Sequence, residues 1–341
     1  MWRPPHPPPR RSNAGPIVAI SLVLLLFAGV ALFGFIAANQ RHSRTADVGY
    51  QRPPAAPTYS APEDPTTTTT RTTTTTTRAG ATTTRTTTTT RSTTTTTQSG
   101  PKPVYTLADN PLFSASNGVN EVTCNLPAWR NDPASSQAFF TAALPCLEQA
   151  WAPAMQRAGL PYSTPGLQFP SGSTWESPCG SASGASWAAF YCPQNNTIYM
   201  PFEGLQTDQN GTKSGVYLAV FAHEFGHHIQ ALSGVLDAYW DTRYEAGDQT
   251  AQGLELSRRS ELQAQCFGGM WFAGGWNGGG SITDPVVRDM LADGYNRGDW
   301  NQNVPRDHGS PQHYGAWQEH GYKNNRTGPC NTWAAAAADV S

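Results

Sequence analysis

The sequence predicts an α+β domain that follows a single transmembrane helix and a disordered threonine-rich stalk. Three observations lead to this fold class. An unbroken apolar run occurs near the N-terminus, threonine blocks follow it, and aromatic residues, turns and cysteines occur together only after them. The last part contains both helical periodicity and a short alternating run. We therefore expect four regions: a cytoplasmic tail (1–15), a transmembrane helix (16–38), a stalk (39–103) and a folded domain outside the cytoplasm (104–341).

The apolar run, IVAISLVLLLFAGVALFGFIAA, extends from Ile17 to Ala38. A helix needs about 20 such residues to cross a bilayer, whereas the apolar core of a cleaved signal peptide has only about 7–15. We therefore expect an uncleaved membrane anchor, and the residues Ile36-Ala37-Ala38 leave cleavage as the alternative. The proline- and arginine-rich residues 1–15 offer nothing to bury, which predicts a disordered tail.

The stalk is predicted by its composition. Pro-Ala segments and threonine blocks such as TTTTTRTTTTTTR occupy the stretch from Asn39 to about Pro103. A chain with so few large apolar groups cannot offset the entropy that it loses on ordering. We therefore expect this stretch to be a solvated spacer between the membrane and the folded domain.

All six cysteines lie beyond the apolar run, and none belongs to a CxxC pair: Cys124, Cys146, Cys179, Cys192, Cys266 and Cys330. An even number of cysteines without CxxC pairs is typical of disulfides in an oxidising compartment. We therefore expect a single-pass membrane protein whose C-terminal domain lies outside the cytoplasm, at the cell surface. Reduced, buried cysteines in a cytosolic domain are the alternative. Spacing alone does not choose among the 15 possible pairings of six cysteines.

The folded region begins with one helical and one β-prone segment. Apolar residues recur at about helical spacing in the stretch 135–158, which predicts a helix. After Gly/Ser/Pro-rich loops, the run Asn196-Thr-Ile-Tyr-Met-Pro201 alternates as a strand does. A strand from Ile198 to Met200 could take up an extended peptide as an added strand, and an ordinary position inside a sheet is the alternative.

A second helix is predicted from Ser214 to Ser233. Apolar residues recur there at steps of three and four, and they form one stripe: Leu218, Phe221, Phe225, Ile229 and Leu232. We expect Ser214 to be the N-cap and Gly234 to end the helix. The stretch AHEFGHHIQ lies in its second half.

His223 and His227 are four residues apart in this stretch, so both rings point from one face of the helix and can share a cation. Glu224 lies one step further round, where it can reach a water on the metal. This is the HExxH pattern, in which two imidazoles bind zinc and the glutamate is the general base. Histidines that make only hydrogen bonds are the alternative. His228 lies about 100° round the helix from His227 and is expected to make a structural hydrogen bond.

A catalytic zinc site needs a third protein ligand and keeps one position for water. The stretch SRRSELQAQCFGGMW, residues 257–271, has helical character and places Glu261 among small and apolar residues. We predict Glu261 as the third ligand, because a carboxylate on a second helix completes a His₂Glu site. Glu245, Asp248 and Glu255 are weaker alternatives, because the Gly-rich, polar stretch around them is more typical of a loop.

Four blocks, FYCPQNNTIYM, VFAHEFGHHIQ, SELQAQCFGGMW and DHGS, resemble the putative neutral zinc metallopeptidases of bacteria, a membrane-anchored group of zincin-like proteins. The resemblance runs from about Cys179 to Trp333, and it does not cover the stalk or the stretch around Cys124 and Cys146. It implies a zincin-like metallopeptidase domain with an HExxH active-site helix. It also implies the following roles: His223, His227 and Glu261 as zinc ligands and Glu224 as the base.

One position departs from the family pattern. The second helix of the family usually reads ELQADC, with an aspartate four residues after the ligand glutamate, and this chain has Gln265 there. Gln265 lies on the same helical face as Glu261, so it is expected to accept a hydrogen bond from a ligand histidine without supplying a charge. The resemblance also implies two disulfides, Cys179 with Cys192 and Cys266 with Cys330, which leaves Cys124 with Cys146 as the third pair.

These residues predict how a peptide bond would be hydrolysed. Zinc lowers the pKa of its water towards about 7 and polarises a carbonyl oxygen. Glu224 would take the proton of that water and pass it to the leaving amine. The tetrahedral oxyanion also needs a donor. His308, in the DHGS segment, is the candidate, with Tyr314 behind it, and a solvated loop histidine is the alternative.

We therefore expect a membrane-anchored zinc metallopeptidase, a hydrolase with Zn²⁺ as cofactor and a peptide or protein as substrate. The N-terminal helix would attach it to the membrane. The alternative is a non-catalytic cell-surface module that holds a structural zinc and binds cell-envelope partners, which the neutral Gln265 would favour. A formal net charge of −2 with 13% charged residues excludes nucleic acid as a partner class.

Overall fold

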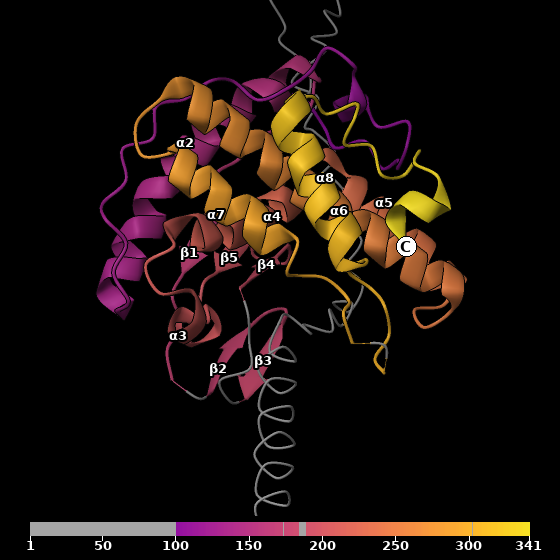
Figure 1. The fold of residues 1–341 in the computed structure, drawn as a ribbon. Helices are drawn as coiled ribbons and strands as arrows, with labels where there is room; N and C mark the ends of the chain where they lie inside the picture. The colour runs from indigo at the N-terminus through magenta and orange to yellow at the C-terminus, as the bar shows by residue number, and fades with distance from the viewer. Residues whose placement is uncertain (1–99, 173, 184–188, 302) are drawn as a thin grey trace, which may run out of the picture.

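The structure, a computed structural model, describes residues 100–172, 174–183, 189–301 and 303–341 (Figure 1). The predicted tail and transmembrane helix, and the stalk as far as residue 99, lie outside these residues. Within the described ranges, no helix has both the length and the apolar character that a membrane span requires. This finding corrects the predicted localisation, a single-pass membrane protein with its C-terminal domain outside the cytoplasm, because the described chain contains no spanning helix.

The described chain is mainly helical and has a small sheet, which agrees with the predicted α+β class. The helices are α2 (Pro133–Arg157), α3 (Thr207–Asn210), α4 (Ser214–Ser233), α5 (Val235–Ala246), α6 (Ala251–Gly278), α7 (Asp284–Gly294) and α8 (Pro311–Asn324). The strands are β1 (Gly166–Gln168), β2 (Thr174–Ser177), β3 (Gly180–Ser183), β4 (Phe190–Cys192) and β5 (Thr197–Tyr199). Three short 3₁₀ helices complete the chain: η1 (Pro111–Phe113), η2 (Phe202–Gly204) and η3 (Ala337–Val340).

Helix α2 confirms the helix predicted over residues 135–158. It begins after Asp132, whose carboxylate accepts a hydrogen bond from the backbone N–H of Ser135 at 2.8 Å. Pro133 occupies the first helical position, where its missing N–H has no intrahelical partner to lose. The apolar face of α2 is buried, and it includes Phe140, Leu147 and Trp151.

The three-stranded sheet has the order β1-β5-β4 and lies below α4 and α7 in Figure 1, while β2 and β3 form a separate hairpin. Strand β5 pairs in parallel with β1, where Thr197 lies opposite Gly166, and antiparallel with β4, where Ile198 lies opposite Tyr191. Both edges of β5 are therefore paired. The prediction that the strand at Ile198 to Met200 takes up an added peptide is wrong, because the neighbouring strands already use its backbone groups.

Helix α4 has the predicted bounds. It ends before Gly234, whose backbone is left-handed with φ 86°, a conformation that glycine adopts without steric cost. The predicted N-cap is wrong by one residue. Ser214 is the first residue of the helix, and Lys213 is the N-cap without a side-chain hydrogen bond.

Helix α6 is longer than the predicted stretch 257–271. It begins after Thr250, whose hydroxyl accepts from the N–H of Gly253 at 3.0 Å, and it packs against α4, α5 and α8. At the crossing with α4, a Cβ on Gly226 would lie only 2.7 Å from the carbonyl oxygen of Ala264. Gly226, inside the HExxH stretch, therefore allows the close approach that brings the faces of α4 and α6 together.

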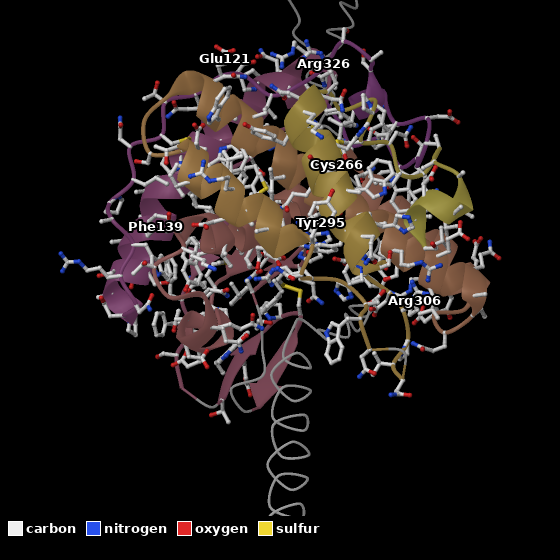
Figure 2. All side chains as sticks on the ribbon, in the orientation of Figure 1. Glu121, Phe139, Cys266, Tyr295, Arg306 and Arg326 are labelled. Atoms are coloured by element: carbon white, nitrogen blue, oxygen red, sulfur yellow. A yellow bond between two sulfur atoms is a disulfide. The ribbon has the colours of Figure 1, made fainter. Side chains whose placement is uncertain are left out.

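The core between these helices is apolar and aromatic. Its largest fully buried side chains include Trp151, Trp271, Phe221, Phe225 and Phe267. Figure 2 shows the contrast with charged residues such as Glu121, Arg306 and Arg326, which lie at the periphery and are exposed. The rings of Trp151 on α2 and Phe267 on α6 meet edge to face at a centroid distance of 5.0 Å. This contact packs α2 against α6.

Three disulfides tie the outer segments to the core: Cys124 with Cys146, Cys179 with Cys192, and Cys266 with Cys330. The last two are the pairs that the resemblance implied, and the first is the pair that they leave. The first joins an extended segment to α2, and the second joins the segment between β2 and β3 to β4. The third joins α6 to the C-terminal segment, so the helix that carries Glu261 is covalently fixed on one side.

Candidate metal centre

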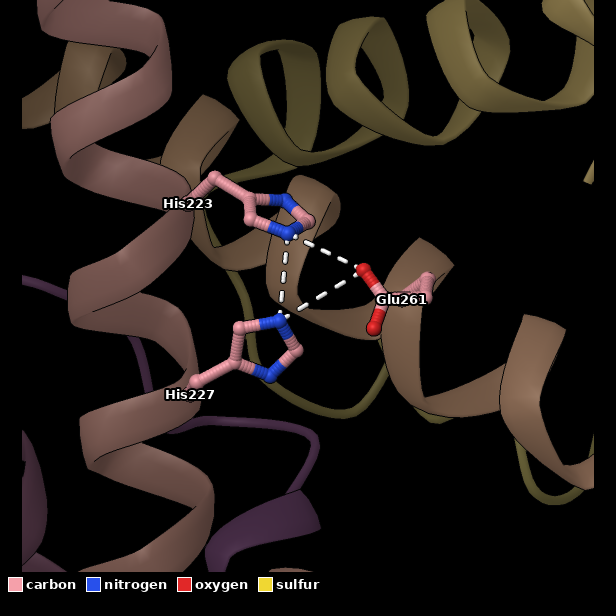
Figure 3. A group of neighbouring side chains, drawn as sticks. All are labelled: His223, His227 and Glu261. Carbon is pink, nitrogen blue, oxygen red and sulfur yellow. Dashed lines mark hydrogen bonds and ion pairs between the residues drawn. The ribbon is translucent and has the colours of Figure 1, made fainter. Parts of the chain in front are cut away.

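His223 and His227 on α4 point towards Glu261 on α6 (Figure 3). The Nε2 atoms of the two histidines are 3.1 Å apart. Oε2 of Glu261 lies 3.1 Å from Nε2 of His223 and 3.5 Å from Nε2 of His227. Three predicted ligands from two helices are thus brought to one point.

These separations fit a tetrahedral zinc ion. Zinc lies about 2.0–2.2 Å from nitrogen and oxygen ligands, so tetrahedral ligand atoms are roughly 3.4 Å apart. The three distances between ligand atoms, 3.1, 3.1 and 3.5 Å, lie close to that value, two below it and one above it. Two imidazoles and a carboxylate are also the donor types that zinc accepts in hydrolases. The geometry and chemistry of the donor set therefore fit zinc, with one position left over.

The remaining ring nitrogens of both histidines face amide oxygens. Nδ1 of His223 lies 2.9 Å from Oε1 of Gln265, as expected for the predicted orienting residue. Nδ1 of His227 lies 2.8 Å from Oε1 of Gln230, which the sequence did not single out. Gln230 follows His227 by three residues, so it lies on the same helical face, and that spacing was the signal that could have found it.

The site combines buried charges of both signs. Burial lowers the pKa of His223, and its hydrogen bond to Glu261 offsets this only in part. Burial also lowers the pKa of His227, but the Glu261 carboxylate outweighs burial and raises it to about 9. Burial raises the pKa of Glu261, but His227 and His308 outweigh it and hold that pKa well below its ordinary value. Glu261 is thus ionised and able to serve as a ligand at neutral pH.

Glu224 is 8% exposed and lines the same cavity as the three predicted ligands. Burial raises its pKa to about 8, although His227 and the backbone N–H of Tyr191 act in the opposite direction. A carboxylate with a pKa near neutrality can both accept and return a proton at physiological pH. The environment of Glu224 therefore suits a general base.

His308 lies at the edge of the site. Its Nε2 is 3.8 Å from Oε2 of Glu261, and its Nδ1 is 2.7 Å from Oδ1 of Asp307. Asp299 accepts hydrogen bonds from the backbone N–H groups of His308 and Gly309, at 2.8 and 2.7 Å, and thereby holds the loop. Burial lowers the pKa of His308, but Glu261 and Asp307 outweigh it and raise it to about 10. His308 is thus held at the edge of the site, with its Nε2 on the side of Glu261.

Among the described residues, the candidate ligand atoms within 4.8 Å of one another form two groups. One is His223, His227 and Glu261, and the other is Asp299, Asp307 and His308. His308 is not part of the first group. Within the described residues, no fourth candidate ligand atom thus joins those of His223, His227 and Glu261.

Apolar and polar residues both line the cavity. The apolar ones are Ala189, Phe190, Ala219 and Val220. The polar ones include Arg297, paired with Asp293 at 2.5 Å, and the buried Tyr314. The sequence predicted Tyr314 behind His308, and the structure places its hydroxyl 3.4 Å from Nδ1 of His223. Asp293 and Arg297 were not predicted, because no local pattern links α7 and the segment after it to the HExxH helix.

The three alternative carboxylates lie elsewhere. Glu245 and Glu255 are in helices α5 and α6, so the loop predicted around them is wrong. Glu255 forms an ion pair with Arg259 at 2.7 Å, and Asp248 lies 3.9 Å from Arg243. None of the three belongs to either ligand group of the described chain.

His228 is fully buried on the other side of α4, as predicted for a structural histidine. Its Nε2 lies 2.9 Å from the carbonyl oxygen of Ser163, and its Nδ1 lies 3.4 Å from the hydroxyl of Tyr191. Burial lowers its pKa to about 4. His228 therefore stays neutral and joins α4 to the loop before β1.

Comparison with known proteins identifies relatives over most of the domain. The family described as "Putative neutral zinc metallopeptidase" matches residues 129–333, more than half of the 341-residue chain. Uncharacterized protein Rv2575 of Mycobacterium tuberculosis is 32% identical over 197 residues, which cover 51% of this chain and 64% of that protein. Uncharacterized protein YpfJ of Escherichia coli is 28% identical over 209 residues, 57% of this chain and 70% of that protein. The chain thus spans less than two thirds of the mycobacterial relative's length. No solved structure matches.

Proposed function

This chain belongs to the family of putative neutral zinc metallopeptidases, and from that premise we propose that it hydrolyses peptide bonds with a zinc-activated water. One observation carries the proposal. Three ligand atoms from His223, His227 and Glu261 lie at tetrahedral zinc spacing, beside the buried carboxylate of Glu224. A structural zinc site is closed by four protein ligands, whereas a catalytic site keeps a position for water. The three-atom group favours the catalytic class.

His223 and His227 would hold zinc through Nε2, and Glu261 through its carboxylate. When bound, zinc supplies a water of lowered pKa and polarises the substrate carbonyl. The carboxylate of Glu261 would balance part of the metal charge. The HExxH stretch on α4 is then the active-site helix of a zincin-like domain.

Glu224 is the proposed general base. Its carboxylate would accept a proton from the attacking water and return it to the leaving amine. Burial raises its pKa to about 8, so its carboxylate is a stronger base than that of an exposed glutamate. Glu224 lines the same cavity as the three proposed ligands.

His308 is the proposed donor to the developing oxyanion. Its Nδ1 is held by Asp307, which directs Nε2 towards the side of Glu261, 3.8 Å away. A donor that is already fixed in place stabilises a developing charge without reorganisation. The mixed apolar and polar lining of the cavity suits a peptide or protein substrate, which has both apolar side chains and a polar backbone.

The test compares the full chain with Glu224→Gln in zinc content and in cleavage of a peptide library. We expect the variant to retain zinc and to lose cleavage, because the amide keeps the shape of the side chain but accepts no proton. A second comparison uses Glu261→Ala, with Glu255→Ala as a control glutamate on the same helix. Only the Glu261 variant should lose zinc.

Neutral Gln265, where the family usually has aspartate, is the observation that favours a non-catalytic zinc module. If wild type and Glu224→Gln both hold zinc and neither cleaves any peptide, the catalytic proposal fails and the module with structural zinc is supported. If wild type binds no zinc, both proposals fail.

A further inference from the structure

The amide of Gln230 is the innermost part of a buried hydrogen-bond chain behind the metal centre. Its Oε1 lies 2.8 Å from Nδ1 of His227, and the Gln230 side chain is 0% exposed. Its Nε2 donates to the carbonyl oxygen of Ser260 at 2.9 Å and to Oε1 of Gln263 at 3.0 Å. Gln263, also 0% exposed, donates in turn to the carbonyl oxygen of Cys330 at 3.3 Å. Gln230 therefore joins α4 to α6.

These contacts fix which way round the Gln230 amide lies. The carbonyl oxygen of Ser260 can only accept a hydrogen bond, so it must face the NH₂ group of Gln230. The oxygen of the Gln230 amide must then face His227. Reversing the amide would place two acceptors against each other at a fully buried position, which costs about 1–3 kcal/mol for each unpaired buried group.

The fixed amide decides the role of each ring nitrogen of His227. Because Oε1 of Gln230 is an acceptor, Nδ1 of His227 must carry a proton and donate it. Nε2 is then the nitrogen left to bind, and it faces Nε2 of His223 at 3.1 Å and Oε2 of Glu261 at 3.5 Å. The same arrangement prevents rotation of the ring.

We propose that Gln230 is a positioning residue of the metal centre, which fixes the ring and the tautomer of His227 through an amide anchored on α6. This inference rests on the proposed zinc binding by His223, His227 and Glu261. It adds a residue that is neither a ligand nor a base. A neutral amide performs here the orienting role that carboxylates and backbone carbonyls perform in many metal sites.

The other histidine is held differently. Nδ1 of His223 lies 2.9 Å from Oε1 of Gln265 and 3.4 Å from the hydroxyl of Tyr314 on α8. Within the described residues, Nε2 of Gln265 donates no hydrogen bond comparable to the one from Nε2 of Gln230 to the carbonyl oxygen of Ser260. His227 is therefore the more firmly oriented of the two histidines, and losing its anchor should weaken metal binding.

The test measures zinc affinity of the full chain by competition with a chelator of known affinity. Gln230→Met keeps the length of the side chain but removes both the acceptor and the donor. We expect its zinc affinity to fall about 10–100-fold, the range found when an orienting partner of a metal ligand is removed. Gln318→Met is the control, since Gln318 is also buried, at 1% exposed. Gln318 neither lines the cavity nor makes a hydrogen bond to a ligand histidine among the described residues. We expect the control to bind zinc as wild type does.

A second readout does not depend on affinity. In the zinc-loaded protein, the Nδ1 proton of His227 should give a slowly exchanging resonance in ¹⁵N-histidine NMR spectra, and Gln230→Met should broaden or shift it. Gln263→Met frees one anchor of the Gln230 amide and leaves the contact with His227, so it should lower affinity by a smaller factor. Gln263→Met also tests the inference if Gln230→Met does not fold.

The outcomes distinguish a failure of the positioning role of Gln230 from a failure of the proposed function. If wild type binds zinc, His227→Ala does not, and Gln230→Met and Gln263→Met match the Gln318 control, the inference about Gln230 is overturned while the proposed function stands. If wild type binds no zinc, the proposed function fails and the positioning role fails with it.

Discussion

Oε2 of Glu261 lies 3.1 Å from Nε2 of His223, although the two residues are 38 positions apart. Two helices that cross closely create this contact. A side chain larger than hydrogen at Gly226 would strike the carbonyl of Ala264 on α6, one turn from the contact. The spacing of the metal centre therefore depends on a glycine that binds nothing itself.

Gly226→Ala should lower both stability and zinc affinity. Its added methyl would lie 2.7 Å from the Ala264 oxygen, so α4 and α6 must separate and the ligand atoms with them. Overpacking of this kind costs about 1–3 kcal/mol of unfolding free energy. Thermal unfolding and chelator competition measure the two effects.

Gly268→Ala is the matched control for that substitution. Gly268 also faces the α4–α6 crossing, but its nearest neighbour would be 3.5 Å from the new methyl group, which is ordinary contact. We expect Gly268→Ala to have the same zinc affinity and the same unfolding temperature as the wild type. Equal behaviour of the two alanine variants would contradict the close-approach explanation.

Gln265→Asp should strengthen zinc binding. Oε1 of Gln265 lies 2.9 Å from Nδ1 of His223, and the shorter aspartate of the family pattern would place a negative charge on the same side of the ring, which makes the imidazole a stronger ligand. We expect a gain in affinity of up to about 10-fold. The chelator competition used for Gln230 measures it, and weaker binding by the aspartate variant would show that Gln265 does not orient His223 by this bond.

His308→Gln should lower kcat and leave zinc content unchanged. Removing one donor to a developing oxyanion typically costs about 100–1,000-fold in kcat. His313→Gln is the control, because His313 contacts Ser310 and Ser341 rather than the cavity. A loss of zinc from the His308 variant as large as that from Glu261→Ala would identify His308 as a ligand instead.

His228 should make the protein less stable in acid. Its pKa is lowered from 6.5 to about 4 by burial, so the unfolded chain binds the proton more readily than the folded one. The destabilisation is absent well above the unfolded pKa, begins as the pH falls through about 6.5, and reaches about 2 kcal/mol near pH 5.

Chemical denaturation of zinc-free protein at about pH 7.5 and about pH 5 measures this loss. The same pair of measurements on His228→Gln removes the titrating group, so the variant should lose about 2 kcal/mol less than wild type over that range. Identical losses in the two proteins would show that His228 does not contribute.

The sequence determined the parts of the site that lie within one helix. Recurring apolar residues gave α4 its bounds from Ser214 to Ser233, and the four-residue spacing of His223 and His227 placed both rings on one face. The helical stretch around Glu261 and its same-face neighbour Gln265 also followed from local spacing. Helical periodicity repeats every few residues, so a short stretch of sequence is enough to predict a helix and the residues that share one of its faces.

Only the tertiary structure decided which segments meet. It placed β5 between two strands instead of at an edge, and it brought Arg297 and His308 to the cavity from segments with no shared pattern. It also turned the Gln230 amide towards His227 by supplying the Ser260 carbonyl from α6. Contacts of this kind depend on how whole helices pack, because close packing couples side chains that are far apart along the chain.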